Sequence, residues 1–150
     1  MTQEHSSARV RRGICFAVAL TLACAGKSGS SPVAPVARCE AGDSTMVRDV
    51  LYFGRNRPTG GVVSDAEWQS FLNEVVTPRF PAGLTVVDAK GQWRGVSGRV
   101  EEERAEILTL FHSGDDAARG AVSEIVDQYK QRFQQEAVLR ERTSACARYG

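Results

Sequence analysis

The sequence predicts an α+β domain in which two helices cover one face of a four-stranded antiparallel sheet. Runs typical of strands occur at residues 46–53, 84–89, 107–112 and 137–143. Two longer segments between them have apolar residues at helical spacing, and glycine or proline residues mark the boundaries. At 150 residues, the chain is long enough for one domain with a single modest core.

The first helix has a defined start and end. Ser64 and Glu67 form a capping box, which satisfies free N–H groups at a helix N-terminus. From Trp68 to Val75, apolar residues recur at positions i, i+3, i+4 and i+7, so one face of the helix is apolar and belongs to the core. Pro78 disfavours the helical conformation of the residue before it, and we expect the helix to end there.

The second strand and the second helix are less sharply bounded. The strand at 84–89 is interrupted at residues 90–91, and residues 92–94 could resume it. A turn follows at 95–98, and the charged run at 101–104 is expected to be a solvated segment before the third strand. Asp115 and Asp116 then open the second helix, where the helix dipole favours acidic residues, and its apolar stripe ends near Gln135.

The order strand, helix, strand, strand, helix, strand is that of the ferredoxin-like split βαβ fold. Right-handed crossovers place the first strand between the third and fourth, which gives the sheet order 4-1-3-2 within a domain at residues 45–146. Both faces of the two central strands are apolar, whereas a solvated face would alternate with polar residues. We therefore expect the face opposite the helices to be covered by a second copy in a homodimer, or by a bound apolar ligand.

The N-terminus is typical of an export signal. Three arginines precede an apolar run at residues 14–23, which is too short to span a bilayer and has the length of a signal-peptide core. The segment Leu22-Ala23-Cys24 is similar to a lipobox, so we expect a signal peptide at residues 1–24, lipidation of Cys24 and a flexible tether at 25–44. Residues 23–25 also fit cleavage to a soluble secreted protein, and that alternative stays open.

The cysteines are interpreted in the same way. Cys15 leaves with the signal, and Cys24 is lipidated or removed. Cys39 and Cys146 remain as an even pair in an oxidising compartment. The fourth strand pairs antiparallel with the first, which brings the start of one beside the end of the other. A Cys39–Cys146 disulfide is therefore predicted.

Several short motifs occur in order along the chain: Leu51-Tyr52-Phe53-Gly54, Arg57-Pro58, Ser64-Asp65-Ala66-Glu67-Trp68, Thr77-Pro78-Arg79-Phe80-Pro81 and Gly91-Gln92-Trp93-Arg94. In these motifs the sequence resembles a bacterial family of small exported proteins, domain of unknown function 3574. The likeness runs from about residue 47 to about residue 140. The resemblance implies no established activity, and no catalytic or binding residue can be carried over from it.

Two groups of residues are candidate sites. The first and second strands run parallel, so Arg55 and Arg57 should lie near Trp93 and Arg94, with Tyr52 beneath them. Such a group could grip a carboxylate or a phosphate. The alternative is that these arginines are surface charges that pair with the acidic residues at 101–103.

The second group lies at the opposite end of the sheet, where Arg79, His112 and Asp115 are expected to approach one another. His112 is the only histidine that remains after processing, and a histidine beside a carboxylate could act as a general base. A structural role at the strand end is the alternative.

Some classes of function are disfavoured. The formal net charge of +1 gives no basic surface of the kind that nucleic-acid-binding proteins have. One histidine and a predicted disulfide leave no ligand set for zinc or haem, and we expect no cofactor. The sequence predicts a lipid-anchored envelope module that binds a small anionic or apolar ligand, or a protein, without catalysis. The alternative is a small cofactor-free acid/base enzyme, of isomerase or oxygenase type, in a dimeric α+β barrel.

Overall fold

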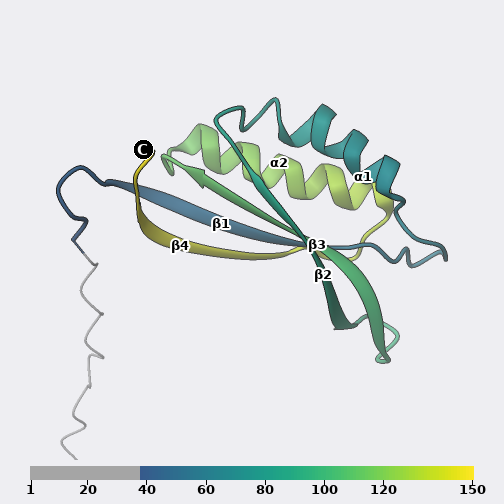
Figure 1. Cartoon of the computed structure of the whole chain (residues 1–150). Coiled ribbons are helices and arrows are strands. Elements are labelled where there is room, and N and C mark those ends of the chain that lie inside the picture. Colours follow the sequence, from purple (N-terminus) through teal and green to yellow (C-terminus); the bar gives the residue numbers. More distant parts are fainter. Residues whose placement is uncertain (1–37) are drawn as a thin grey trace, which may run out of the picture. The chain divides into compact units, whose positions relative to one another are not determined.

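The computed structural model describes residues 38–150 and shows the expected order of elements (Figure 1). The elements are β1 (Ser44–Gly54), α1 (Asp65–Phe71), the π-helical turn η1 (Leu72–Val76), β2 (Thr85–Arg94), β3 (Val100–His112), α2 (Asp116–Phe133) and β4 (Leu139–Ala147). Neighbouring strands are all antiparallel, in the order β2-β3-β1-β4. The predicted fold class and strand order are confirmed.

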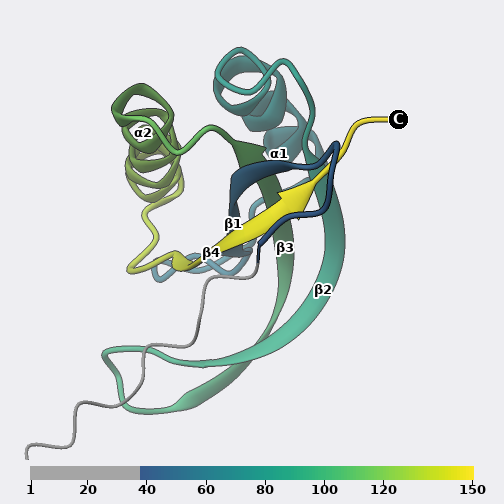
Figure 2. The same cartoon turned by 90° about the vertical axis from the view of Figure 1, so that its left-hand side faces the viewer.

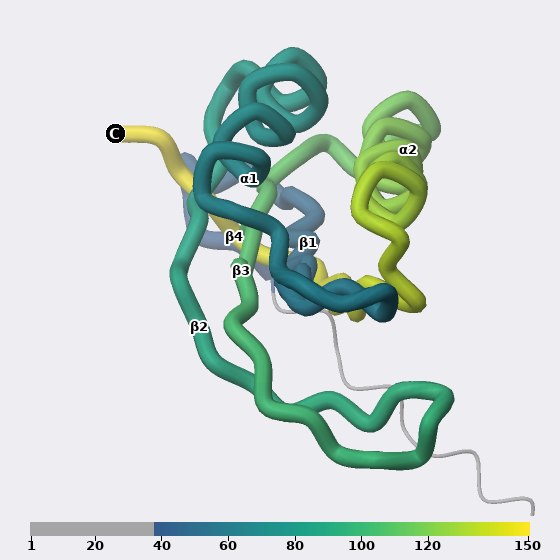
Figure 3. Tube along the Cα trace, turned by 90° about the vertical axis from the view of Figure 1, so that its right-hand side faces the viewer, coloured from purple at the N-terminus to yellow at the C-terminus, as the bar shows by residue number. Residues whose placement is uncertain are grey.

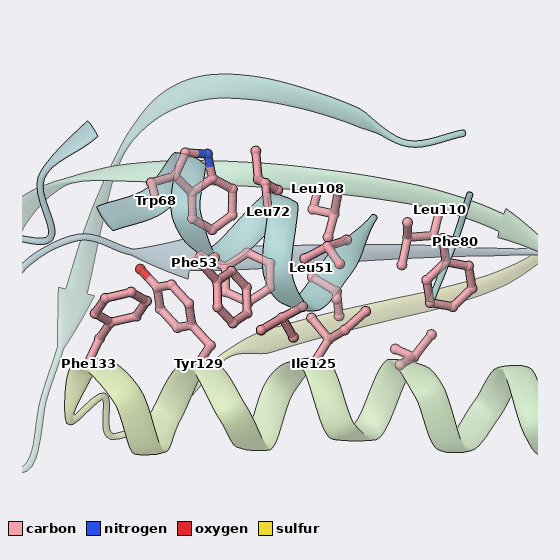
Figure 4. Packing of buried hydrophobic residues seen from close by; sticks show 14 of the residues in the cluster. Leu51, Phe53, Trp68, Leu72, Phe80, Leu108, Leu110, Ile125, Tyr129 and Phe133 are labelled. Carbon is pink, nitrogen blue, oxygen red and sulfur yellow. The ribbon is translucent and has the colours of Figure 1, made fainter. Parts of the chain in front are cut away.

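Both helices lie side by side on one face of the sheet, and the other face is left open (Figure 2). The core fills the space between the helices and the sheet, where Phe53 from β1 meets Trp68 and Phe71 from α1 and Tyr129 from α2 (Figure 4). The ring centroids of Phe53 and Tyr129 are 4.6 Å apart, in the edge-to-face geometry that aromatic pairs prefer. The Tyr129 hydroxyl donates to the Gly54 carbonyl at 2.9 Å, so the polar end of this buried ring is satisfied.

The β2–β3 hairpin is longer than the sequence predicts. β2 continues without a break to Arg94, and β3 already begins at Val100, with Gly91 paired to Glu103 and Trp93 to Glu101. The charged run at 101–104 therefore belongs to a strand. Its hydrophilic pattern indicated a solvated segment because this part of the hairpin extends past the helices and has little apolar surface to bury. Figure 3 shows the hairpin curling beneath the open face of the sheet.

A disulfide joins Cys39 to Cys146, with the Cα atoms 5.3 Å apart. This predicted bridge is confirmed, and the reason is the expected one. Thr45, near the start of β1, is directly opposite Cys146 near the end of β4, so the chain just before β1 reaches it. Cys24 and the predicted signal and tether up to residue 37 lie outside the described residues. Within residues 38–150, no helix has the length and apolar character needed to cross a membrane.

Candidate functional site

A pocket of about 510 Å³ lies where the curled hairpin faces the end of β1. Its lining comes from the end of β1 and the loop after it, the hairpin, and the connection between α2 and β4. The lining residues are Tyr52, Gly54, Asn56, Arg57, Pro58, Gly91, Gln92, Trp93, Gly95, Val96, Ser97, Arg99, Glu101, Glu103, Ala105, Gln135, Glu136, Ala137 and Leu139. Pockets of this volume are large enough for a small organic ligand.

Strand alternation determines which β1 and β3 residues reach the pocket. Leu51 and Phe53 point into the core, so Tyr52 and Gly54 point to the open face. Glu103 lies on that same face of β3. A Cβ atom at Gly54 would come within 2.5 Å of a Glu103 carboxylate oxygen. Glycine at position 54 therefore lets the Glu103 carboxylate lie directly against the β1 backbone.

Glu103 is held there by one hydrogen bond. The backbone N–H of Asn56 donates to its Oε2 atom at 3.2 Å. Burial raises the pKa of the Glu103 carboxyl group, the Asn56 N–H partly opposes this shift, and the charge of Glu101 adds to it. A half-buried carboxyl group with a raised pKa in a pocket is a feature of functional sites.

The tip of the hairpin is fastened to the other wall of the pocket. The backbone N–H of Val96 donates at 3.3 Å to the carboxylate of Glu136, which lies in the connection between α2 and β4. Gln135 from the same connection donates to the Asn56 carbonyl at 2.7 Å. Trp93 lines the same pocket, and its large aromatic side chain stays 45% exposed. An exposed aromatic side chain inside a pocket is available to a ligand.

The predicted group of arginines does not gather around one space. Arg55 is only 3% exposed, donates to the Val63 carbonyl and forms ion pairs with Glu106 and Asp65. The Arg94 guanidinium donates to the Gly98 carbonyl within the hairpin turn and is not part of the pocket lining. Tyr52, Arg57 and Trp93 do line the pocket.

Arg57 is already paired at the rim of the pocket. Its Nη2 atom donates to the Glu67 carboxylate at 2.6 Å, and its guanidinium lies 5.7 Å from the centroid of the Phe133 ring. The same Glu67 carboxylate accepts from Ser64, and these contacts with Ser64 and Arg57 lower its pKa to about 2. The alternative considered from the sequence was that these arginines pair with the acidic residues at 101–103. Arg55 and Arg57 instead pair with other carboxylates.

The second predicted group is also dispersed. Arg79 pairs with Glu124 and donates to the Val75 carbonyl. Asp115 caps α2 by accepting from the Ala118 N–H at 2.8 Å, and this bond, with help from Ser113, lowers the pKa of its carboxyl group. His112 is buried, and neither Arg79 nor Asp115 is its hydrogen-bond partner.

The partner of His112 is Asp49, a residue that sequence reasoning missed. The His112 Nε2 atom lies 2.8 Å from a carboxylate oxygen of Asp49, and its Nδ1 atom accepts from the Gly114 N–H at 3.0 Å. Both ring nitrogens are therefore engaged within the protein. Arg140 and Arg142 each donate two hydrogen bonds to the Asp49 carboxylate, at 2.9 Å and 3.1 Å respectively.

The cluster joins β3, β1 and β4 on the helix face of the sheet, and it combines the buried Asp49 and His112 with the partly exposed Arg140 and Arg142. Asp49 is fully buried, and each of its oxygens has two or more donors. The sequence contained a sign of this cluster. An aspartate interrupts the apolar strand β1, and two arginines occur two residues apart on β4. Such a satisfied carboxylate is typical of a structural element. Across residues 38–150, no group of three or more His, Cys, Asp or Glu side chains is placed to hold a metal ion.

A family model described as "Protein of unknown function (DUF3574)" matches residues 48–149. The chain belongs to this family. The match begins within β1, extends through β4 and includes every pocket residue, so the resemblance carried by the short sequence motifs is confirmed. None of the curated proteins matches this DUF3574 protein.

Two solved structures of a phage SAM lyase support the fold. A phage SAM lyase in complex with S-methyl-5'-thioadenosine has a TM-score of 0.56 at 14% identity, over 74% of this chain and 95% of the lyase. A phage SAM lyase in the apo state has a TM-score of 0.52 at 13% identity, over 77% of this chain and 98% of the lyase chain. CutA from Synechococcus elongatus, complexed with Bis-Tris, has a TM-score of 0.41 at 10% identity, over 70% of this chain and 83% of the CutA chain. At these identities the likeness to the lyase concerns the fold alone.

Proposed function

We propose that this DUF3574 protein is an exported, lipid-anchored protein of the cell envelope whose domain binds a small ligand without catalysing a reaction. The observation that carries the proposal is the pocket of about 510 Å³ in which Trp93 remains 45% exposed. Ligand sites are typically concave, with aromatic side chains and a few placed polar groups. The Cys39–Cys146 disulfide is compatible with export, because such bridges persist in oxidising compartments.

Native mass spectrometry of the full-length protein purified from its own host tests ligand binding. We expect a retained small molecule on the wild type that is lost in Trp93→Ala. Tyr149→Ala is the matched control, because Tyr149 is 72% exposed and lies outside the pocket lining. A wild type that carries no ligand, or a Trp93→Ala variant that keeps it, would contradict the proposal.

The anchor is tested separately. Cys24→Ala should abolish incorporation of labelled palmitate and release the protein from the membrane fraction. Cys15→Ala is the control, since Cys15 is expected to leave with the signal and its loss should not change labelling. A wild type that is soluble and unlabelled would instead support cleavage to a secreted form.

A cofactor-free acid/base enzyme is the second candidate, and Glu103 is the observation that favours it. Its carboxyl group has a raised pKa and faces a pocket that also contains the Tyr52 ring. Such an enzyme would exchange solvent deuterium into its substrate. The protein should then label a component of a host metabolite extract in D₂O, and Glu103→Gln should not. Absence of any protein-dependent labelling would favour the binding module.

A further inference from the structure

We infer that the pocket takes a small organic cation with an apolar or aromatic part, and that Glu103 supplies the counter-charge. The inference rests on the proposed function, because it names the class of ligand for the same pocket. The sequence predicts a small anionic or apolar ligand, and the contacts of the charged side chains are the reason for choosing a cation instead.

The charge balance of the lining is the first reason. Three carboxylates line the pocket, from Glu101, Glu103 and Glu136, against the guanidinium groups of Arg57 and Arg99. Arg57 is neutralised by Glu67, which is not a lining residue. The charge that faces the pocket is therefore negative, and it favours a cation over an anion.

The lack of a basic partner for Glu103 is the second reason. In residues 38–150, Glu106 is paired with Arg55 on the helix face of β3, whereas no salt bridge engages Glu103 on the open face. The Asn56 N–H donates to one of the two carboxylate oxygens of Glu103. A half-buried carboxylate without a basic partner costs free energy, and a bound cation would reduce that cost.

Aromatic side chains are the third reason. Trp93 and Tyr52 line the same pocket as Glu103, and the strand register puts all three on the same face of the sheet. Indole and phenol ring faces attract cations and also bury apolar groups. A carboxylate that lines the same pocket as two such rings is suited to a ligand that combines a positive charge with an apolar or aromatic group.

Binding of three probes that share a benzyl or phenyl group tests the inference: benzyltrimethylammonium, benzyl alcohol and benzoate. Isothermal titration calorimetry with the folded full-length protein should show the cation binding about tenfold tighter than the other two. In Glu103→Gln, the affinities for the cation and the alcohol should come within about threefold of each other. Weaker binding of all three probes to Trp93→Ala would place them in the pocket.

Two controls make the result specific. Glu102→Gln removes the same charge from the neighbouring residue, which is exposed and is not part of this lining, and it should keep the cation preference. Gly54→Ala should reduce the preference by displacing the Glu103 carboxylate without changing its charge. Gly120→Ala adds the same methyl group on α2, outside the pocket lining and where no atom lies within 4 Å, and it should keep the preference.

Other outcomes would overturn the inference. Tighter binding of benzoate, equal binding of all three probes, no binding of any probe, or a cation preference that survives Glu103→Gln would each do so. The proposed function is judged separately by ligand retention in the host-purified protein. A retained neutral or anionic molecule would thus leave that function standing while the cation inference fails.

Discussion

At the scale of single residues, buried carboxylates have opposite roles in this domain. Asp49 is fully buried but accepts hydrogen bonds from Arg140, Arg142 and His112. Glu103 is half-buried, and its carboxylate accepts a hydrogen bond from the Asn56 N–H. The first carboxylate stabilises the fold, and the second leaves interaction energy available for a ligand.

Asp49→Asn should destabilise the domain. The variant loses the charge that holds both arginines to the sheet, and it replaces an acceptor oxygen with an amide donor. Because Arg140 and Arg142 are partly exposed and can be hydrated, we expect a loss of about 2–3 kcal/mol in the free energy of unfolding. Urea unfolding measured at neutral pH checks this value.

The matched control is Asp43→Asn, which makes the same change in the more exposed Asp43–Arg148 ion pair. Exposed ion pairs contribute little, and the control should lose less than about 1 kcal/mol. Equal losses in the two variants would show that the buried cluster has no special role in stability.

The raised pKa of Glu103 predicts a pH dependence. Between its ordinary value of 4.5 and its higher value in the folded protein, the folded state binds more protons than the unfolded state, so this group lowers stability as pH rises through that window. Relative to Glu103→Gln, the wild type should therefore lose thermal stability between pH 4 and pH 7. Melting temperatures of both proteins at the two pH values measure the effect. The melting temperature of Glu102→Gln should change between the two pH values by as much as that of the wild type. The same change in Glu103→Gln would contradict the prediction.

At the scale of elements, α1 and the β2–β3 hairpin differ in what defines them. The start of α1 is local, since Ser64 accepts from the Glu67 N–H and Glu67 accepts from the Ser64 N–H. The outer part of the hairpin depends on contacts with distant segments, such as the Val96–Glu136 hydrogen bond. A local pattern therefore predicts the first element well and the second one poorly.

Ser64→Ala should cost about 1 kcal/mol of stability, because it removes the side-chain acceptor at the N-terminus of α1. Ser123→Ala is the control, since Ser123 is an exposed position within α2 where alanine is a better helix former. Chemical denaturation of both variants compares the two positions. The cap would be unimportant if Ser64→Ala were as stable as the wild type.

At the scale of the whole molecule, the Cys39–Cys146 disulfide closes a loop across 107 residues of sequence. The chain-entropy model gives up to about 4.7 kcal/mol for a loop of that order, with smaller values more common. We expect the double variant Cys39→Ser/Cys146→Ser to lose about 2–4 kcal/mol in urea unfolding. Wild-type protein treated with a reductant should match it, and an unchanged midpoint in both would contradict the prediction.

The open face of the sheet predicts self-association. Val50 on that face is buried, Ile107 and Phe111 are half-buried, and Val87 and Leu139 are more than half exposed. We expect a homodimer through this face, because such apolar surfaces are usually covered. Phe111→Glu, which lies outside the pocket lining, should give monomers in multi-angle light scattering. Asp127→Lys, a charge change on α2, should leave the mass unchanged, and a wild-type monomer at high concentration would refute the dimer.

The order of the elements, the strand order and the disulfide pair could all be predicted from the sequence alone. These features follow from local periodicity, from the handedness of crossovers and from the covalent limits on cysteine spacing. Ser64, Pro78 and the two cysteines each act on their neighbours in sequence or through the predicted strand order. Such information can be read without knowing which side chains meet.

The contacts of the charged residues, in contrast, depend on the three-dimensional fold. Arg55 becomes buried because Glu106 and Asp65, distant in sequence, receive its guanidinium. Asp49 is satisfied because the register of β4 places two arginines beside it. Glu103 reaches the pocket because the hairpin extends past its predicted end and Gly54 leaves room for its carboxylate. The pairing of charges depends on register and curvature over long distances, and the local pattern of polar residues contains neither.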